Sequence, residues 1–355
     1  MVKRKARHPA RIAIGAGAAL LLVCAIASAQ TGPERRSDGA ARIPIVLDGS
    51  FQNAAWSPSG AQIVFTRFRG RGYNKGPADI LIFDLQQATV RNLMFDGRTN
   101  VTQPGSTWNA RTDQIVFSST RKEHDEIFTI RSDGRLTSLK QLTSDEEYAA
   151  YEPSMSPDGQ SVVFEAHIVG DRSNGVIRRV SVGLLKPQDL TEPDEDGDCR
   201  QPNWSPAGDA IVYQKRKEKG PWDLWIYDLR SKEHRQLTTG KGDKTDATFS
   251  PDGHWVVYSA DNSRLPQAKL FAINTQGGTP IQITQSEGYD GAPSWSPDGK
   301  SIVFESPAQV SAPLEGEESG APGASKRRHP PTALWTISVP ESLRQRLCVS
   351  GAPCR

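Results

Sequence analysis

A short acidic loop in the second half of the chain has the residue pattern best suited to holding an ion. Asp194, Asp196 and Asp198 alternate with other residues, and Gly197 lies between the last two. Carboxylate oxygens at positions i, i+2 and i+4 of a glycine-containing loop can converge on Ca²⁺. The downstream glutamate of a full calcium loop is missing, so a plain acidic loop is the alternative. Ca²⁺ is the one cofactor that the sequence suggests.

The elements that position these acids follow from a phrase that occurs six times. At its clearest it is Trp-Ser-Pro-Asp-Gly followed by a short apolar strand. Its leading residues, spaced 45 to 52 positions apart, are Trp56, Trp108, Met155, Trp204, Phe249 and Trp295. A period of this length with several strands per unit is typical of a radial array of β-sheets.

Each repeat divides into four strands, a to d. In the fourth repeat they are expected at residues 200–204, 210–214, 222–229 and 233–238. Four-stranded units repeated six times can close into a ring, which leaves only short, protected sheet edges. The sequence therefore predicts an all-β fold, a six-bladed β-propeller of four-stranded antiparallel blades. The repeated motif residues are interpreted as core and turn residues.

Strand order decides which loops share a face of the ring. The a–b and c–d turns lie on one side, which we call the turn face, and the b–c and d–a loops form the opposite long-loop face. Binding residues tend to lie in long loops on a rigid scaffold. The d–a loops are acidic, and two b–c loops, at residues 67–75 and 215–219, are basic. We expect an acidic zone at the channel mouth with basic patches further out, or else loop charges that are merely solvated.

The candidate binding residues combine this loop set with one position per repeat. The residue three places before each leading residue should approach the channel mouth, where acids and amides could hold a cation or a polar ligand, or else surround water. With the acids of the d–a loops, the candidates are Asn53, Asp145, Glu146, Glu147, Glu152, Gln201, Asp243, Asp246 and Asp290.

The repeats resemble those of the TolB-like propeller family, which carry the same Trp-Ser-Pro-Asp-Gly element and a Leu-Thr element in strand d. The resemblance covers residues 43–349. TolB has an α/β domain before its propeller, whereas here residues 30–42 are expected to be a flexible linker, so a stand-alone propeller is expected. Residues 43–47 are expected to add an outer strand to the last blade. Residues 306–331 are interpreted as a disordered insertion in blade six, and residues 350–355 as a tail.

The first 29 residues have the pattern of a secretory signal peptide. A basic start is followed by the apolar stretch 12–26 and by Ala27-Ser28-Ala29. An uncleaved membrane anchor is the alternative. Because five of the 43 Lys and Arg residues and none of the 41 Asp and Glu residues lie there, the remainder carries a net charge of about −3. That value argues against a general nucleic-acid binder. The pairing of Cys199, Cys348 and Cys354 stays open.

These observations predict a secreted or periplasmic binding module, monomeric, that docks a protein or peptide of the cell envelope through its long-loop face. No nucleic acid and no stable membrane insertion after signal cleavage are expected. Enzyme signatures are mostly absent, because no Gly-x-Ser-x-Gly elbow and no phosphate-binding glycine loop occur. The alternative is a metal-assisted lyase or hydrolase for a carbohydrate or lactone-like substrate, with His124 and His167 near the long-loop face. No catalytic residue is assigned.

Overall fold

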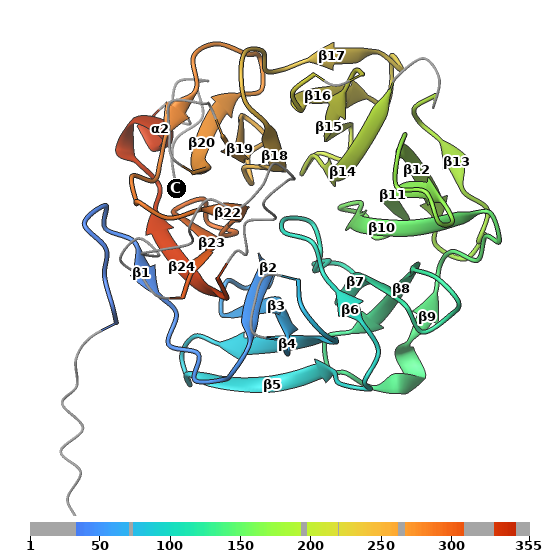
Figure 1. Cartoon of the computed structure of the whole chain (residues 1–355), viewed down its shortest axis with the longest axis horizontal. Coiled ribbons are helices and arrows are strands. Elements are labelled where there is room, and N and C mark those ends of the chain that lie inside the picture. The colour runs from blue at the N-terminus through green and yellow to red at the C-terminus, as the bar shows by residue number, and fades with distance from the viewer. Residues whose placement is uncertain are drawn as a thin grey trace, which may run out of the picture. The chain divides into compact units, whose positions relative to one another are not determined.

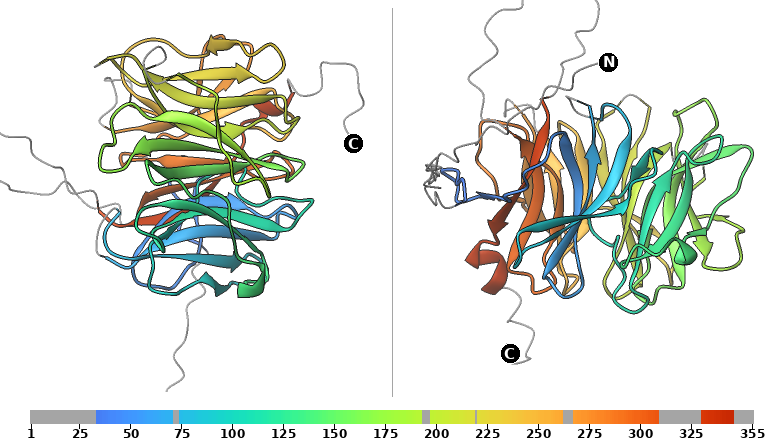
Figure 2. Two further views of the ribbon diagram at one scale, coloured as in Figure 1. Left: turned by 90° about the vertical axis from the view of Figure 1, so that its right-hand side faces the viewer. Right: turned by 90° about the horizontal axis from the view of Figure 1, so that it is seen from below.

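The fold is described from a computed structural model of the chain. The structure describes residues 33–70, 74–192, 197–218, 220–261, 267–308 and 330–345. These residues form six four-stranded antiparallel sheets arranged around one axis, as Figure 1 shows. Figure 2 shows from the side that neighbouring sheets stand face to face around the ring. The prediction of a six-bladed β-propeller is confirmed.

The strands follow the predicted order in every blade. The first blade contains β2 (Ser50–Trp56), β3 (Gln62–Phe68), β4 (Ala78–Asp84) and β5 (Thr89–Met94). The second contains β6 (Asn100–Val101), β7 (Gln114–Ser119), β8 (Glu126–Arg131) and β9 (Lys140–Gln141), with the 3₁₀ turn η1 (Leu136–Ser138) before β9. The third contains β10 (Tyr148–Met155), β11 (Ser161–Ile168), β12 (Val176–Ser181) and β13 (Gln188–Asp189).

The remaining blades repeat this arrangement. The fourth contains β14 (Asp198–Trp204), β15 (Ala210–Arg216), β16 (Asp223–Asp228) and β17 (His234–Gln236). The fifth contains β18 (Lys244–Phe249), β19 (Trp255–Ala260), β20 (Lys269–Asn274) and β21 (Ile281–Gln282). The sixth contains β22 (Gly291–Trp295), β23 (Ser301–Pro307), β24 (Thr332–Ser338) and β1 (Ala41–Arg42), and the helix α2 (Glu341–Gln345) follows β24. No helix in the described ranges is long and apolar enough to cross a membrane.

The repeated motif builds each a–b turn by side-chain hydrogen bonds. In the sixth blade the hydroxyl of Ser296 donates to Asp298 at 2.6 Å and accepts from the backbone N–H of Ser301 at 2.9 Å. Gly299 follows with φ +69°, a left-handed conformation that favours glycine. The apolar residues of the flanking strands are buried between sheets; for example, Ile82 and Phe117 pack in one cluster across the first and second blades. The motif residues therefore serve turn and core, as predicted.

The N-terminal segment closes the ring. Ala41 and Arg42 of β1 pair with Thr336 and Trp335 of β24, so the last blade takes its outer strand from the start of the chain. The expectation that residues 43–47 provide this strand is off by two residues, although the backbone N–H of Ile43 still donates to Leu334 at 2.9 Å. Residues 33–42, expected to belong to a flexible linker, are bound to the ring. The expected signal peptide and tail, and residues 309–329 of the expected insertion, lie outside the described residues.

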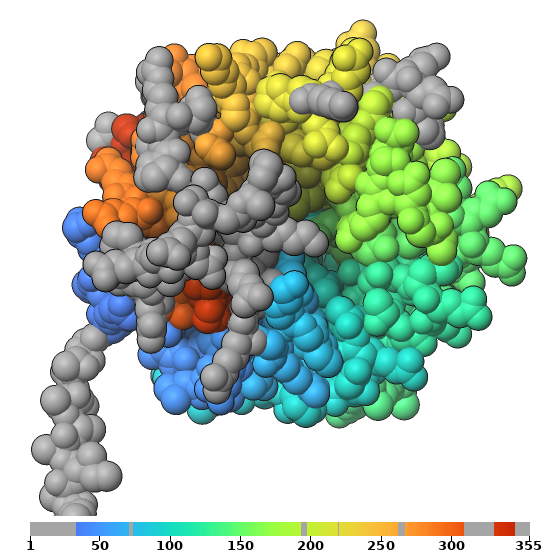
Figure 3. Space-filling model, in the orientation of Figure 1, coloured from blue at the N-terminus to red at the C-terminus, as the bar shows by residue number. Residues whose placement is uncertain are grey.

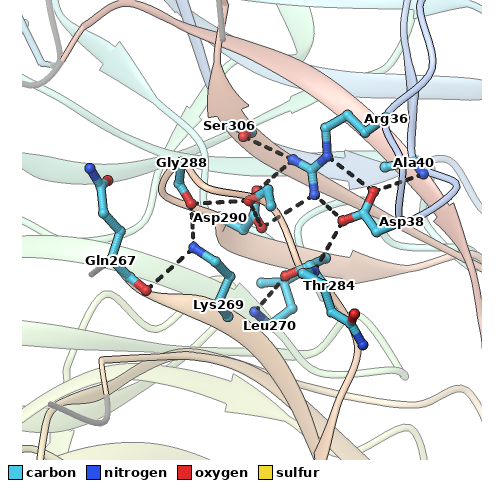
Figure 4. Close-up of polar contacts among 12 residues, drawn as sticks. Arg36, Asp38, Ala40, Gln267, Lys269, Leu270, Thr284, Gly288, Asp290 and Ser306 are labelled. Atoms are coloured by element: carbon cyan, nitrogen blue, oxygen red, sulfur yellow. Dashed lines mark hydrogen bonds and ion pairs between the residues drawn. The ribbon is translucent and has the colours of Figure 1, made fainter. Parts of the chain in front are cut away.

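Arg36 anchors this segment, as Figure 4 shows. Its guanidinium donates to Asp290 at 2.7 Å, to Ser306 at 3.1 Å and to Asp38 at 2.5 Å. The same group lies over the rings of Phe304 and Trp335, 5.2 and 5.3 Å from their centroids. Because the carboxylate of Asp290 is fully buried, its charge depends on this guanidinium for compensation.

Replacing Arg36 by glutamine should destabilise the ring strongly, because it leaves the buried Asp290 carboxylate without its counter-charge. We expect the free energy of unfolding, measured in urea, to fall by about 3 kcal/mol or more. Arg42→Gln is the matched control, since its ion pair with Glu34 at 3.0 Å is partly exposed on both sides, and it should change stability by at most about 1 kcal/mol. Equal losses in the two variants would contradict the anchoring role.

Candidate functional site

In five blades the inner strand contains one residue in the left-handed backbone region, and in the second blade Gly105, which follows β6, takes this conformation. The strand pairing shifts register at this point in five of the six blades. The residues are the ones that lie three places before each leading residue of the motif, with φ between 46° and 90°: Asn53, Gly105, Glu152, Gln201, Asp246 and Ala292. Such β-bulges turn a residue out of the sheet and leave its backbone N–H outside the ladder. Figure 1 places the inner strands β2, β10, β14, β18 and β22 around the centre of the ring.

Side chains of the preceding blade accept the freed N–H groups at three junctions. The N–H of Asn53 donates to Glu305 at 3.2 Å, and that of Gln201 donates to Glu165 at 3.0 Å. The N–H of Asp246 donates to the side-chain oxygen of Gln201 at 2.9 Å, and the amide of Gln201 returns a hydrogen bond of 2.9 Å to the Asp246 carboxylate. Since a buried N–H requires an acceptor, these oxygens are fixed in the channel by the backbone.

Glu165 and Glu305 were not among the predicted site residues. Both come directly after the aromatic residue of strand b and are almost completely buried. The same position is polar in all six blades, with side chains from Thr66, Ser118, Glu165, Gln214, Ser259 and Glu305. A polar residue that recurs next to an apolar strand was the signal that could have revealed them.

Glu152 differs from the other channel acids. No hydrogen bond to its carboxylate is found among the described residues, and its side chain is partly exposed. Its pKa is raised well above the usual value, first by loss of solvation inside the ring and then by the nearby carboxylates of Glu165, Asp246 and Glu305, whereas Arg172 opposes the shift. The pKa of Asp246 is also raised by loss of solvation, although hydrogen bonds from Thr245, Gln201 and the backbone of Ala292 oppose it.

The buried His167, from β11 of the third blade, lies beside these acids. The ring nitrogen Nε2 of the buried His167 lies 3.2 Å from Oε1 of Glu165. When Nε2 donates this bond, Nδ1 is left without a partner among the described residues. Tyr151 packs against the His167 ring, and the Arg172 guanidinium covers the Tyr151 ring at 4.1 Å. Arg172 also approaches Glu165 to 3.6 Å, so a cation already contacts the edge of the cluster.

Comparisons with known proteins identify the repeat. Residues 189–310 match the family described as the TolB beta propeller domain, PD40. The solved structure of a putative TolB from Agrobacterium tumefaciens aligns with a TM-score of 0.54 and 19% identity, over 63% of this chain and 76% of that one. The chain carries a TolB-like β-propeller. An oligogalacturonate lyase in complex with manganese shares the fold of this propeller, with a TM-score of 0.55 and 14% identity over 88% and 97% of the two chains.

Sequence relatives of the TolB-like propeller match it over a limited part. An uncharacterized protein, Atu1656, of Agrobacterium fabrum is 31% identical over 101 residues, which are 28% of this chain and 33% of that protein. The matches to the first curated relatives span between 16% and 33% of those proteins' length.

The predicted acids of the loops before β10 and β18 are exposed or engaged with neighbouring residues. Asp145 pairs with Arg178 at 3.0 Å and accepts the N–H groups of Glu147 and Tyr148. Glu146 and Glu147 are exposed. Asp243 is exposed and accepts the N–H of Trp222 at 3.0 Å. Figure 3 shows the surface in the orientation of Figure 1, with a hollow near the centre of the ring.

Two predicted acids are engaged inside the propeller. Asp290 is buried against Arg36, and its second oxygen accepts from Ser286 at 2.7 Å, so we leave it out of the candidate site. Asp198 accepts from Gly175, Arg200 and Arg216 at 2.8 to 3.1 Å. These bonds occupy its oxygens and argue against a calcium ligand.

Asp194 and Asp196 lie outside the described residues, as do Cys348 and Cys354, and Cys199 is buried in β14. The described residues contain no group of three or more His, Cys, Asp or Glu side chains placed to hold a metal ion.

The raised pKa of Glu152 should make the stability of the TolB-like propeller depend on pH. As pH rises from the ordinary glutamate pKa through the raised one, the unfolded chain has already released a proton that the folded protein still holds, so stability is lost. Glu152→Gln removes this loss. We expect the variant's free energy of unfolding to exceed that of the wild type by an amount that grows with pH above about 4.3.

Urea unfolding at several pH values between 4 and 8 measures this difference. Glu233→Gln is a matched control, because Glu233 is exposed in the turn between β16 and β17 on the turn face. A difference between Glu152→Gln and the wild type that stays constant with pH would contradict the assignment.

Proposed function

We propose that this protein is a secreted or periplasmic binding module whose long-loop face captures a partner protein through an extended basic segment. The observation that carries the proposal is the Glu152 carboxylate, which has no hydrogen-bond partner in the described part of the chain and lies among three further acids. An amine or guanidinium entering the channel mouth would offset this repulsion. The interaction would gain strength because the site is partly removed from water.

The carboxylates of Glu165 and Glu305 support the proposal because hydrogen bonds hold them in place. Glu165 and Glu305 are tied to backbone N–H groups, so they form a preorganised negative wall around Glu152. Arg172, stacked on Tyr151 and directed at Glu165, provides an internal example of the chemistry that the site accepts. A partner guanidinium could combine the same aromatic and carboxylate contacts.

The outer loops would add specificity rather than most of the affinity. Glu146, Glu147 and Asp243 are exposed in d–a loops, and exposed charges at an interface mainly steer association. The secretory pattern at the N-terminus supports a partner in the envelope or outside the cell. Recognition by one face of one ring requires only a monomer.

A fluorescent hexa-arginine peptide tests the proposal by anisotropy. We expect binding that weakens with added salt, and Glu152→Gln should lower the affinity by about tenfold, the scale of one charge-assisted hydrogen bond. Glu233→Gln on the turn face removes the same charge and should leave the affinity unchanged. Glu152→Gln binding as tightly as the wild type, or a hexa-glutamate peptide binding equally, would refute the proposal.

A metal-assisted lyase or hydrolase is the second candidate function, and the observation that favours it is the buried His167–Glu165 pair with an unpartnered ring nitrogen. Titration with Mn²⁺, followed by calorimetry, discriminates the two. Stoichiometric Mn²⁺ binding that His167→Gln abolishes would favour the enzyme, whereas peptide binding that is independent of Mn²⁺ would favour the binding module.

A further inference from the structure

A cavity of about 420 Å³ lies between the third and fourth blades. It is lined by the a–b turns of both blades, at Ser156–Asp158 and Ala207–Gly208, and by Leu229 after β16, so it opens on the turn face. Arg111, Asp158 and Ala207 at its rim are exposed, which makes the cavity accessible from solvent. Its volume is within the range of pockets that hold small molecules.

Two guanidinium groups give this cavity a positive lining. Neither Arg111 nor Arg179 has a carboxylate within 4.0 Å in the described ranges, unlike most buried or half-buried arginines of this chain. Arg179 donates to the hydroxyl of Ser161 at 3.1 and 2.9 Å, which fixes the plane of its guanidinium. The one acidic side chain in the lining, Asp158, already accepts from Ser156 at 2.5 Å and from the N–H of Gln160 at 2.9 Å.

An aromatic wall with an unsatisfied donor completes the cavity. Trp204 lines it and is 3% exposed, and its indole N–H has no acceptor among the described residues. The leading tryptophans of the first two blades do have one: Trp56 donates to Ser294 at 3.2 Å, and Trp108 donates to Asp113 at 3.1 Å. This N–H is itself closed off from solvent, so Trp204 borders the cavity through its ring rather than through a hydrogen bond to a ligand.

The cavity between the fifth and sixth blades provides an internal comparison. It measures about 220 Å³ and is formed by the equivalent turns, with Trp255 and Trp295 in its lining. The indole N–H groups of these two residues also lack an acceptor in the described part of the chain. Its charged lining residues, however, are Asp252 and Asp298. The two cavities share their architecture and have opposite charge, so the pair of arginines is not a requirement of the propeller.

We propose that the cavity between the third and fourth blades binds a small planar carboxylate, with its flat apolar body against Trp204 and its anionic group between Arg111 and Arg179. The guanidinium groups match a carboxylate in charge and geometry. Pro157, Ala207 and Leu229 provide the apolar contacts for the ring. The site is separate from the acidic channel. Its proposed ligand on the turn face is an anion, whereas the segment proposed to enter the channel is cationic.

Benzoate is the probe for this site, observed by NMR of the folded protein with ¹⁵N-labelled tryptophan. Trp204→Phe assigns the Trp204 indole signal. We expect millimolar benzoate to shift that signal, with no comparable shift at Trp255 or Trp295. Benzamide, which keeps the ring and removes the charge, should bind at least about tenfold more weakly.

Substitution of the arginines locates the anion. Arg179→Gln and Arg111→Gln should each weaken benzoate binding by about tenfold, while Arg179→Lys should retain part of it. Arg135→Gln, an exposed arginine of the second blade that does not line the cavity, should bind benzoate like the wild type. An unshifted Trp204 signal, equal binding of benzamide, or an unchanged affinity in both glutamine variants would overturn the proposal. Unchanged near-ultraviolet circular dichroism in each variant shows that the fold is retained.

Discussion

The hydrogen bonds between the bulged inner strands and the preceding blades determine what the channel contains. Each bulge turns one residue to positive φ and removes its N–H from the sheet. That N–H must find an acceptor inside the ring, and at Asn53 and Gln201 the acceptor is a glutamate of the neighbouring blade. These bonds connect the blades, and they also concentrate carboxylates where water is scarce. The acidity of the channel is therefore a consequence of how the ring is held together.

This origin divides the channel acids into two kinds. Glu165 and Glu305 satisfy the backbone, and Asp246 exchanges hydrogen bonds with Gln201. Glu152 sits at the same bulge position but has no such bond among the described residues, and loss of solvation, together with the other acids, raises its pKa. The Glu152 carboxylate has no structural hydrogen bond among the described residues and lies near other negative charges. This is the feature of the ring that most favours a cationic ligand. Asp290 differs from Glu152, because its buried carboxylate is already paired with Arg36 of the same chain.

The fold and the bulge positions near the inner strands could both be predicted from the sequence. Six copies of one phrase at a nearly constant spacing predict the blades, and counting three residues back from each leading residue finds Asn53, Glu152, Gln201 and Asp246. The bulge itself could not be foreseen, because it is a property of backbone pairing. Glu165 and Glu305 were missed because they follow the aromatic of strand b, within a segment interpreted as core.

Charge alone was a poor guide to exposure. Asp290 and Asp198 resemble mouth acids in the sequence, but Asp290 is neutralised by Arg36 from the start of the chain, and Asp198 by Arg200 of its own strand and Arg216 of the next. No binding site was predicted on the turn face, because its motif residues were interpreted as turn and core residues. The cavity beside Trp204 arises only when neighbouring blades meet, where residues of the second, third and fourth repeats combine.

A direct titration of Glu152 tests the central claim that the bulged inner strands hold an uncommitted carboxylate among other acids. The side-chain carboxyl carbon, labelled with ¹³C and followed by NMR against pH in the folded wild-type protein, reports its pKa without reference to any ligand. The account predicts a midpoint well above the ordinary glutamate value of about 4.3, moving down towards that value when Asp246 is replaced by asparagine. A midpoint at or below the ordinary value would contradict it.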